Sequence, residues 1–323
     1  MRIACLQFSP KLGRVEENIQ KADQFLEPVK SSKIDLLVLP EMAFSGYNFP
    51  SLEAITPYLE PTNSGISTHW ARSTAQRLNC HVTVGYPEKT TTSPSKNYNT
   101  LVTVSPEGDI VATYRKSFLY YTDETWASEG DAGFFHGPLG PLGPTCMGIC
   151  MDINPRRFSA PWTAYEFATH CVNFATPLVV LSMAWLTRLL PQELQQSAEE
   201  PDLETLAYWI ERFFPLVGAK LPDGVVVVLA NRCGTEPGSV AGVSRGVGER
   251  GEEVVSYAGS SCVLKIEEGR VQVYNILGKC EEALLVIDTK DVSPANHRVT
   301  PAQSRFSQLT RRQHPKFALH PTM

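Results

Sequence analysis

The chain has 323 residues, of which 42% are hydrophobic and 20% are charged, a composition that supplies a large buried core. Its formal net charge of −5 gives no positive surface for nucleic acid or for an anionic membrane. The N-terminal segment lacks the apolar core of a signal peptide, and the apolar stretch 171–186 is too short to span a bilayer. A soluble cytoplasmic protein is therefore expected.

Short apolar runs recur along the chain and have the composition of buried strands. Helical spacing of apolar residues occurs at 19–29 and again at 203–217. Because some strands are joined by helices and others by hairpins, the pattern predicts an α/β protein with mixed sheets. The expected strands are 2–8, 34–39, 80–86, 99–104, 109–114, 145–150, 178–183, 224–230, 253–256, 261–266, 271–277 and 283–288.

Two segments fall outside this regular pattern. The segment 187–202 is polar and contains two prolines, so it is expected to be a surface insertion, with a lid as one candidate role. The C-terminal extension 291–323 is rich in proline and basic residues and shows no clean period. We expect it to wrap the body or to be partly mobile. A single catalytic domain would then cover 1–290.

Three reactive side chains, Glu41, Lys116 and Cys150, each follow an apolar run that predicts a strand. Ligands in α/β proteins bind beyond the carboxyl ends of strands, so the three groups are expected at one edge of the fold. Each residue alone also has an ordinary interpretation, because cysteines often fill cores and a lysine or glutamate after a strand is usually solvated or begins a helix. The combination favours a nucleophilic site.

The expected chemistry is attack of the Cys150 sulfur on an amide carbon. A free thiol has a pKa near ~8.5, so a base must take its proton at neutral pH. Glu41 would serve as that base if burial raises its pKa, and Lys116 would stabilise the oxyanion. The backbone N–H of Met151, just after the nucleophile, is the expected second oxyanion donor. A thioester on Cys150 would form and then be hydrolysed.

The eight cysteines are scattered and show neither paired CxxC spacing nor a nearby histidine cluster. This spacing predicts no disulfide framework and no zinc site.

The three reactive residues lie in three distinctive blocks of sequence: Leu39-Pro-Glu-Met-Ala-Phe-Ser-Gly-Tyr47, Tyr114-Arg-Lys-Ser-Phe-Leu119 and Gly148-Ile-Cys-Met-Asp152. These blocks resemble the catalytic blocks of the nitrilase, or carbon–nitrogen hydrolase, superfamily. The resemblance covers roughly 1–290 and implies a four-layer αββα sandwich with a Glu41, Lys116 and Cys150 triad that uses no metal and no organic cofactor. This family often has a second glutamate after the lysine, and Glu124 is the best match; its role would be to orient Lys116.

Within the superfamily, stretches such as Phe118–Glu124 and Cys150–Pro155 are most similar to enzymes that deamidate N-terminal Asn and Gln to Asp and Glu in the N-degron pathway. Such a substrate presents a cationic α-amine beside a neutral amide, and a peptide that continues outward. The site would need acids for the amine and an apolar wall for the side chain. Candidate acids are Asp123, Glu124, Glu129 and Asp152, and candidate wall residues are Tyr47, Trp126 and Trp185.

Two other functions remain open from the sequence. The first is a small-molecule carbon–nitrogen hydrolase of the ω-amidase or N-carbamoyl amidohydrolase type. The second is a non-catalytic binding protein that keeps the fold. The sequence does not give the oligomeric state; relatives of this kind often pair through sheet faces or helices, so a homodimer is one candidate.

Overall fold

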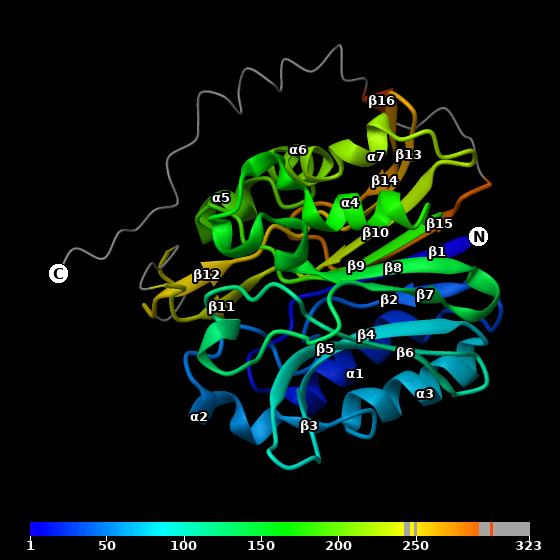
Figure 1. Ribbon diagram of the computed structural model, residues 1–323. Helices are drawn as coiled ribbons and strands as arrows, with labels where there is room; N and C mark the ends of the chain where they lie inside the picture. The colour runs from blue at the N-terminus through cyan, green and yellow to red at the C-terminus, as the bar shows by residue number, and fades with distance from the viewer. Residues whose placement is uncertain (242–245, 249–250, 291–297, 300–323) are drawn as a thin grey trace.

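The computed structural model describes residues 1–241, 246–248, 251–290 and 298–299. Two β-sheets lie face to face in the middle of the molecule, and helices cover the outer face of each (Figure 1). This is the four-layer αββα sandwich that the sequence predicts, so the expected fold is confirmed. None of the helices in the described ranges is long and apolar enough to cross a membrane.

The first sheet has seven strands. Its central strands β1, β2 and β4 run parallel, and the hairpins β4–β5 and β5–β6 extend it on one side. Strand β15 closes the other side antiparallel to β1. In spatial order the strands are β15 (Ala283–Asp288), β1 (Arg2–Gln7), β2 (Leu36–Val38), β4 (His81–Lys89), β5 (Asn97–Val104) and β6 (Ile110–Arg115), with β3 (Glu60–Pro61) beside β4.

The second sheet also has seven strands, and it is built around the parallel strands β8, β9 and β10. A separate two-stranded ribbon of β11 (Thr235–Pro237) and β12 (Val254–Ser256) lies at one end of the sandwich (Figure 1). The strands of the second sheet are, in order, β16 (Arg298–Val299), β14 (Arg270–Ile276), β13 (Cys262–Glu267), β10 (Val225–Asn231), β9 (Leu178–Met183), β8 (Pro144–Ile149) and β7 (Phe135–Pro138).

Alternating side chains of the central strands pack in two directions, because successive residues of a strand point to opposite faces. On β1, Ile3 and Cys5 belong to the core that includes the second sheet, whereas Ala4 and Leu6 pack toward the helices of the first sheet. Both faces are apolar, so these strands read as continuous hydrophobic runs in the sequence.

Helices cover the outer face of each sheet, and the sequence pattern predicts only some of them. Helices α1 and α3 lie on the first sheet, and α4, α6 and α7 lie on the second. The apolar spacing predicts α1 and the α6–α7 region, although the latter breaks at Phe213. Helices α3 and α4 were not expected. The helices are α1 (Val15–Leu26), α2 (Leu52–Ile55), α3 (Ile66–Leu78), α4 (Glu166–Asn173), α5 (Pro191–Gln196), α6 (Leu203–Arg212) and α7 (Phe214–Gly218).

The expected surface insertion 187–202 contains the short helix α5, whose Leu194 is buried. Its two ends meet, because the Thr187 hydroxyl donates to the Asp202 carboxylate over 2.8 Å. The C-terminal extension 291–323 lies outside the described residues, apart from the backbone of β16, which pairs with β14.

The strand directions bring several chain segments to one edge of the sandwich. Strands β2 and β4 are parallel, and β6 returns to the same direction after two antiparallel turns. The carboxyl ends of β2 and β6 therefore lie at the same edge, as does the beginning of β5. Across the interface, the Ser182 hydroxyl of β9 donates to the Leu39 carbonyl over 2.7 Å, which places the carboxyl end of β9 there as well.

Candidate active site

Glu41 stands three residues beyond the end of β2 and is fully buried. Its Oε2 accepts a hydrogen bond from the backbone N–H of Ala184 over 2.9 Å, and its own N–H donates to the Met183 carbonyl over 3.4 Å. Gly85 makes this placement possible, because a Cβ there would lie 2.7 Å from the backbone nitrogen of Met42. Glu41 follows a strand of the first sheet, and backbone groups that follow or end a strand of the second sheet fix its position.

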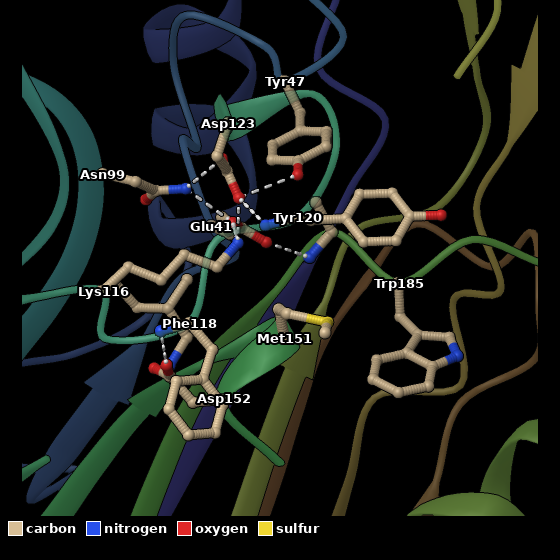
Figure 2. A network of polar contacts seen from close by, with 12 residues as sticks. Glu41, Tyr47, Asn99, Lys116, Phe118, Tyr120, Asp123, Met151, Asp152 and Trp185 are labelled. Atoms are coloured by element: carbon tan, nitrogen blue, oxygen red, sulfur yellow. Dashed lines mark hydrogen bonds and ion pairs between the residues drawn. The ribbon is translucent and has the colours of Figure 1, made fainter. Parts of the chain in front are cut away.

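Lys116 follows β6 directly and is also fully buried. Its ammonium donates to Glu41 Oε1 over 2.7 Å and to Asp123 Oδ2 over 2.6 Å (Figure 2). Burial alone would lower the pKa of Lys116, but the charges of Asp123 and Glu41 outweigh burial and the net shift is upward. The side chain is therefore a fixed ammonium.

Asn99 joins the two carboxylates that hold the lysine. Its amide nitrogen donates to Glu41 Oε1 over 2.7 Å and to Asp123 Oδ1 over 3.0 Å. Asp123 also accepts the Tyr120 N–H over 2.9 Å and the Tyr47 hydroxyl over 3.3 Å. Every side chain of this network except that of Tyr120 is buried, so it forms a rigid polar cluster in a low-dielectric surrounding.

Cys150 is the first residue after β8 and begins a short 3₁₀ turn, Cys150–Ile153. Its φ is +39°, a left-handed conformation that costs a non-glycine residue about 1–3 kcal/mol. The residue is 8% exposed, whereas Glu41 and Lys116 are 0% exposed. Cys150 is therefore the most exposed of the three residues, although it is still buried.

The pKa values of the three groups fit the chemistry expected of them. Burial and the charge of Glu41 raise the pKa of the Cys150 thiol, while Lys116 and the Ala184 N–H oppose that rise. Burial also raises the pKa of Glu41, against the attraction of Lys116. A neutral thiol and a carboxylate of increased basicity are the two states that proton transfer from Cys150 to Glu41 requires.

Asp152 is not the amine-binding acid that the sequence predicts. Its carboxylate is fully buried and accepts four hydrogen bonds from the protein itself. The donors are the Ile149 N–H at 2.7 Å, the Tyr114 hydroxyl at 2.7 Å, the Ser117 N–H at 3.1 Å and the Phe118 N–H at 2.8 Å. Asp152 thus ties the turn that carries Cys150 to the segment that carries Lys116. Burial raises its pKa to about 6 against these hydrogen bonds.

The prediction that Glu124 orients Lys116 is also wrong. Glu124 is exposed, and the neighbouring Asp123 is the buried carboxylate that binds the lysine. The two residues open a 3₁₀ turn, Asp123–Thr125, in which only the first can point inward. Asp123 is therefore committed to Lys116 and does not serve as a free acid for a substrate amine. Glu129, a further expected acid, instead pairs with Arg156 over 2.5 Å.

The candidate wall residues lie at different depths. Tyr47 is 2% exposed, and its ring centre lies 5.6 Å from the Lys116 nitrogen. Trp126 is buried in the same apolar cluster as Tyr47. Trp185 is half-buried; Figure 2 shows it beside Met151 and below the ring of Tyr120, all on one side of the Glu41 network. The side chain of Met151 itself is buried.

Sequence reasoning missed Asn99 and the Ala184 N–H as members of the site. Asn99 lies in a segment, Asn97–Leu101, that resembles a recurrent segment of the superfamily, and this was the available signal. The role of Ala184 could not be found, because any residue supplies a backbone N–H. Within the described ranges, no group of three or more His, Cys, Asp or Glu side chains is placed to hold a metal ion.

Comparisons with known proteins show the family of the chain. The family model described as carbon-nitrogen hydrolase matches residues 2–161. The protein N-terminal amidase of Schizosaccharomyces pombe is 34% identical over 304 residues, which cover 88% of this chain and 98% of that protein. The protein N-terminal amidase of Saccharomyces cerevisiae is 31% identical over 207 residues, which cover 58% of this chain and 45% of that protein.

Crystal structures of an N-terminal amidase with a Gln-Val peptide and with an Asn-Glu peptide share the fold. Both have a TM-score of 0.76 over 93% of this chain and 98% of theirs, with 21% and 22% sequence identity. The chain therefore belongs to the carbon–nitrogen hydrolase family. It is a hydrolase that cleaves amide C–N bonds, and among its relatives it is similar to protein N-terminal amidases.

Proposed function

We propose that the protein removes the side-chain amide of N-terminal Asn and Gln residues, converting them to Asp and Glu with release of ammonia. Two observations together carry this proposal. The first is a buried Glu41–Lys116–Asp123 network whose charges act on the pKa of Cys150. The second is 34% identity to a protein N-terminal amidase along nearly its whole length. The enzyme would act in the cytoplasm, at the deamidation step of the N-degron pathway.

The first half of the reaction forms a thioester. Glu41 takes the Cys150 proton as the sulfur attacks the side-chain amide carbon, and a tetrahedral oxyanion develops. Glu41 then returns the proton to the nitrogen, the C–N bond breaks, and ammonia leaves. In the second half, Glu41 takes a proton from water, the hydroxide attacks the thioester carbon, and Cys150 leaves as the thiol with the proton from Glu41.

Lys116 can stabilise the oxyanion without becoming an acid. Two of its three N–H donors are used by Glu41 and Asp123, which in the described part of the chain leaves the third for the substrate oxygen. The Met151 backbone N–H is proposed as the second donor, because it follows the nucleophile directly. Such a donor is typically worth about 10²–10³ in rate.

The acids first expected to bind the substrate amine lie in different surroundings. Asp123 and Asp152 are saturated by internal hydrogen bonds, Glu124 is exposed, and Glu129 pairs with arginine. The half-buried ring of Trp185 faces the same side of the network as Met151 (Figure 2). An ammonium over an aromatic ring gains about 0.5–2 kcal/mol, so we propose that Trp185 receives the α-amine.

Ammonia release from matched peptides tests the function. Peptides headed by Asn or Gln should release ammonia, and the same peptides with an acetylated α-amine should not. Faster turnover of free ω-amides or N-carbamoyl acids would replace the proposal by a small-molecule amidase. Intact-mass detection of a thioester adduct that disappears in Cys150→Ala would identify the nucleophile and exclude a non-catalytic binding protein.

A homodimer is part of the proposal as well. The outer helices α6 and α7 expose Leu203 and Phe214 by 60% and 54%, and we propose that these side chains lie in the contact between the two copies. Sedimentation equilibrium measures the mass directly, and a monomer at micromolar concentration would remove this part of the proposal.

A further inference from the structure

A second buried ion pair lies behind the catalytic network, at the base of the β11–β12 ribbon. Arg232 follows β10 and Glu236 lies on β11; both side chains are 0% exposed. They are directly hydrogen-bonded through Arg232 Nη1 and Glu236 Oε1. Arg232 also donates to the Pro10 carbonyl over 2.8 Å and stacks on the Tyr257 ring at 4.0 Å.

Glu236 gives most of its acceptor capacity to the loop that follows Glu41. Its carboxylate accepts the Tyr47 N–H at 3.0 and 3.2 Å and the Asn48 N–H at 2.8 Å. The Tyr257 hydroxyl adds a further bond of 2.6 Å. A charged acceptor is therefore fixed against two consecutive backbone donors, which makes these hydrogen bonds stronger than neutral ones.

The backbone of that loop is shaped to admit the carboxylate. Gly46 has a φ of +79°, and a Cβ at this position would lie 2.6 Å from Glu236 Oε1. No other residue type allows both this backbone conformation and this approach without strain. The glycine and the glutamate thus act together to set the position of residue 47.

Tyr47 carries this position into the active site. Its hydroxyl donates to the Asp123 carboxylate over 3.3 Å, and its ring lies against Lys116. We infer that Glu236 is a positioning residue for Lys116, which acts through the backbone of Tyr47 and the Tyr47–Asp123 hydrogen bond. The inference rests on the catalytic role proposed for Lys116, but not on the identity of the substrate.

Glu236→Gln removes the charge and one acceptor while it keeps the shape. The Tyr47 loop then loses an anchor, Lys116 shifts, and kcat falls about tenfold to a hundredfold, because a 1 Å misplacement at a catalytic group costs about 10² in rate. Glu88→Gln is the matched control, since Glu88 is equally buried and pairs with Arg115. This control should lose stability and keep its kcat.

Two readouts separate positioning from a purely structural role. The first is kcat on an Asn-headed peptide. The second is the rate at which iodoacetamide alkylates Cys150, followed by peptide mass spectrometry, which needs no substrate. Because Lys116 lowers the pKa of Cys150, its displacement slows alkylation at pH 7. Slow alkylation would appear even if the proposed substrate were wrong, so the two failures remain distinguishable.

A double-mutant cycle tests whether Glu236 acts on Lys116 through Tyr47. Tyr47→Phe removes only the hydroxyl and should reduce both readouts, and adding it to Glu236→Gln should reduce them little further. The pair Arg232→Met with Glu236→Leu removes both charges together with the acceptor of the Tyr47 and Asn48 N–H groups, so it tests the anchor without leaving an unpaired buried arginine. That pair should still fail in both readouts.

Three results would overturn the inference. The first is wild-type kcat and alkylation in Glu236→Gln or in the apolar pair. The second is unchanged readouts in Tyr47→Phe, which keeps every Glu236 contact and therefore tests the route even if the other variants fail to fold. The third is strictly additive effects of the Glu236 and Tyr47 changes.

Discussion

Asp123 and Glu124 offer a sharp test of the site, because they are adjacent acids in opposite surroundings. Asp123 is buried against Lys116, whereas Glu124 is exposed. Asp123→Asn and Glu124→Gln each remove one negative charge and almost no volume. We expect the first to damage both stability and catalysis, and the second to change neither.

The size of the effect follows from the 2.6 Å ion pair between Lys116 and Asp123. At an effective dielectric constant of 20, two unit charges at that distance attract by about 6 kcal/mol. Relief of the desolvation of Asp123 offsets part of this, and loss of one partner of a buried pair typically costs about 3–5 kcal/mol. Since Glu41 still holds Lys116, the loss should lie near the lower end of that range.

Catalysis should change in a defined direction. Asp123 contributes to the raised pKa of Glu41, so Asp123→Asn lowers that pKa and makes Glu41 a weaker base. The acid limb of kcat/KM moves to lower pH. At the optimum kcat should fall by about 10²–10³, because Lys116, the proposed oxyanion donor, loses its second anchor.

Urea unfolding measures the stability change, and ammonia release from an Asn-headed peptide between pH 4 and 9 measures the catalytic one. Glu124→Gln in the same assays is the control. The reasoning would be refuted if the two variants lost activity equally, or if Asp123→Asn kept its kcat and its acid limb.

Four further predictions concern single residues. The free energy of unfolding of Cys150→Gly should exceed that of Cys150→Ala by up to about 1 kcal/mol, because glycine tolerates the positive φ at this position. Equal urea midpoints of the two variants would contradict a left-handed turn. Asp152→Asn should lower stability by about 1–3 kcal/mol and lower kcat, since a buried N–H loses its acceptor. Because the pKa of Glu41 is raised, its carboxylate becomes protonated at a higher pH than that of an ordinary glutamate as the pH falls. The acid limb of kcat/KM should therefore lie above pH ~4.3, and a pH–rate profile measures it. Trp185→Leu should raise KM for peptides with a free α-amine and keep kcat, whereas Trp185→Phe should not.

Much of the fold was accessible from the sequence because its central strands are buried on both faces. The runs at 178–183 and 283–288 coincide with β9 and β15. Helix α3 was missed because its buried face contains Ser67, Thr68 and Thr74, which are small and polar. Apolar periodicity cannot report a helix whose inner face is lined in this way.

The residues of the site also differ in how far the sequence could predict them. Glu41 and Lys116 could be placed because each follows a recognisable strand, and the structure brings them into contact. The choice between Asp123 and Glu124 depends on which face of a one-turn helix points inward, and no periodicity exists over three residues. The structural role of Asp152, which joins two loops, depends on contacts with residues far away in sequence.

The groups of the proposed active site are carried by opposite halves of the sandwich. Glu41, Asn99 and Lys116 come from the first sheet, whereas Cys150 and the Ala184 N–H come from the second. Neither half holds a working set, so the reactive centre exists only while the two sheets keep their mutual register. A cavity opened between them, for example where the Thr103 hydroxyl meets the Met147 sulfur at 3.9 Å, could silence the enzyme well before the chain unfolds. The rate of turnover therefore reports on the packing between the two sheets.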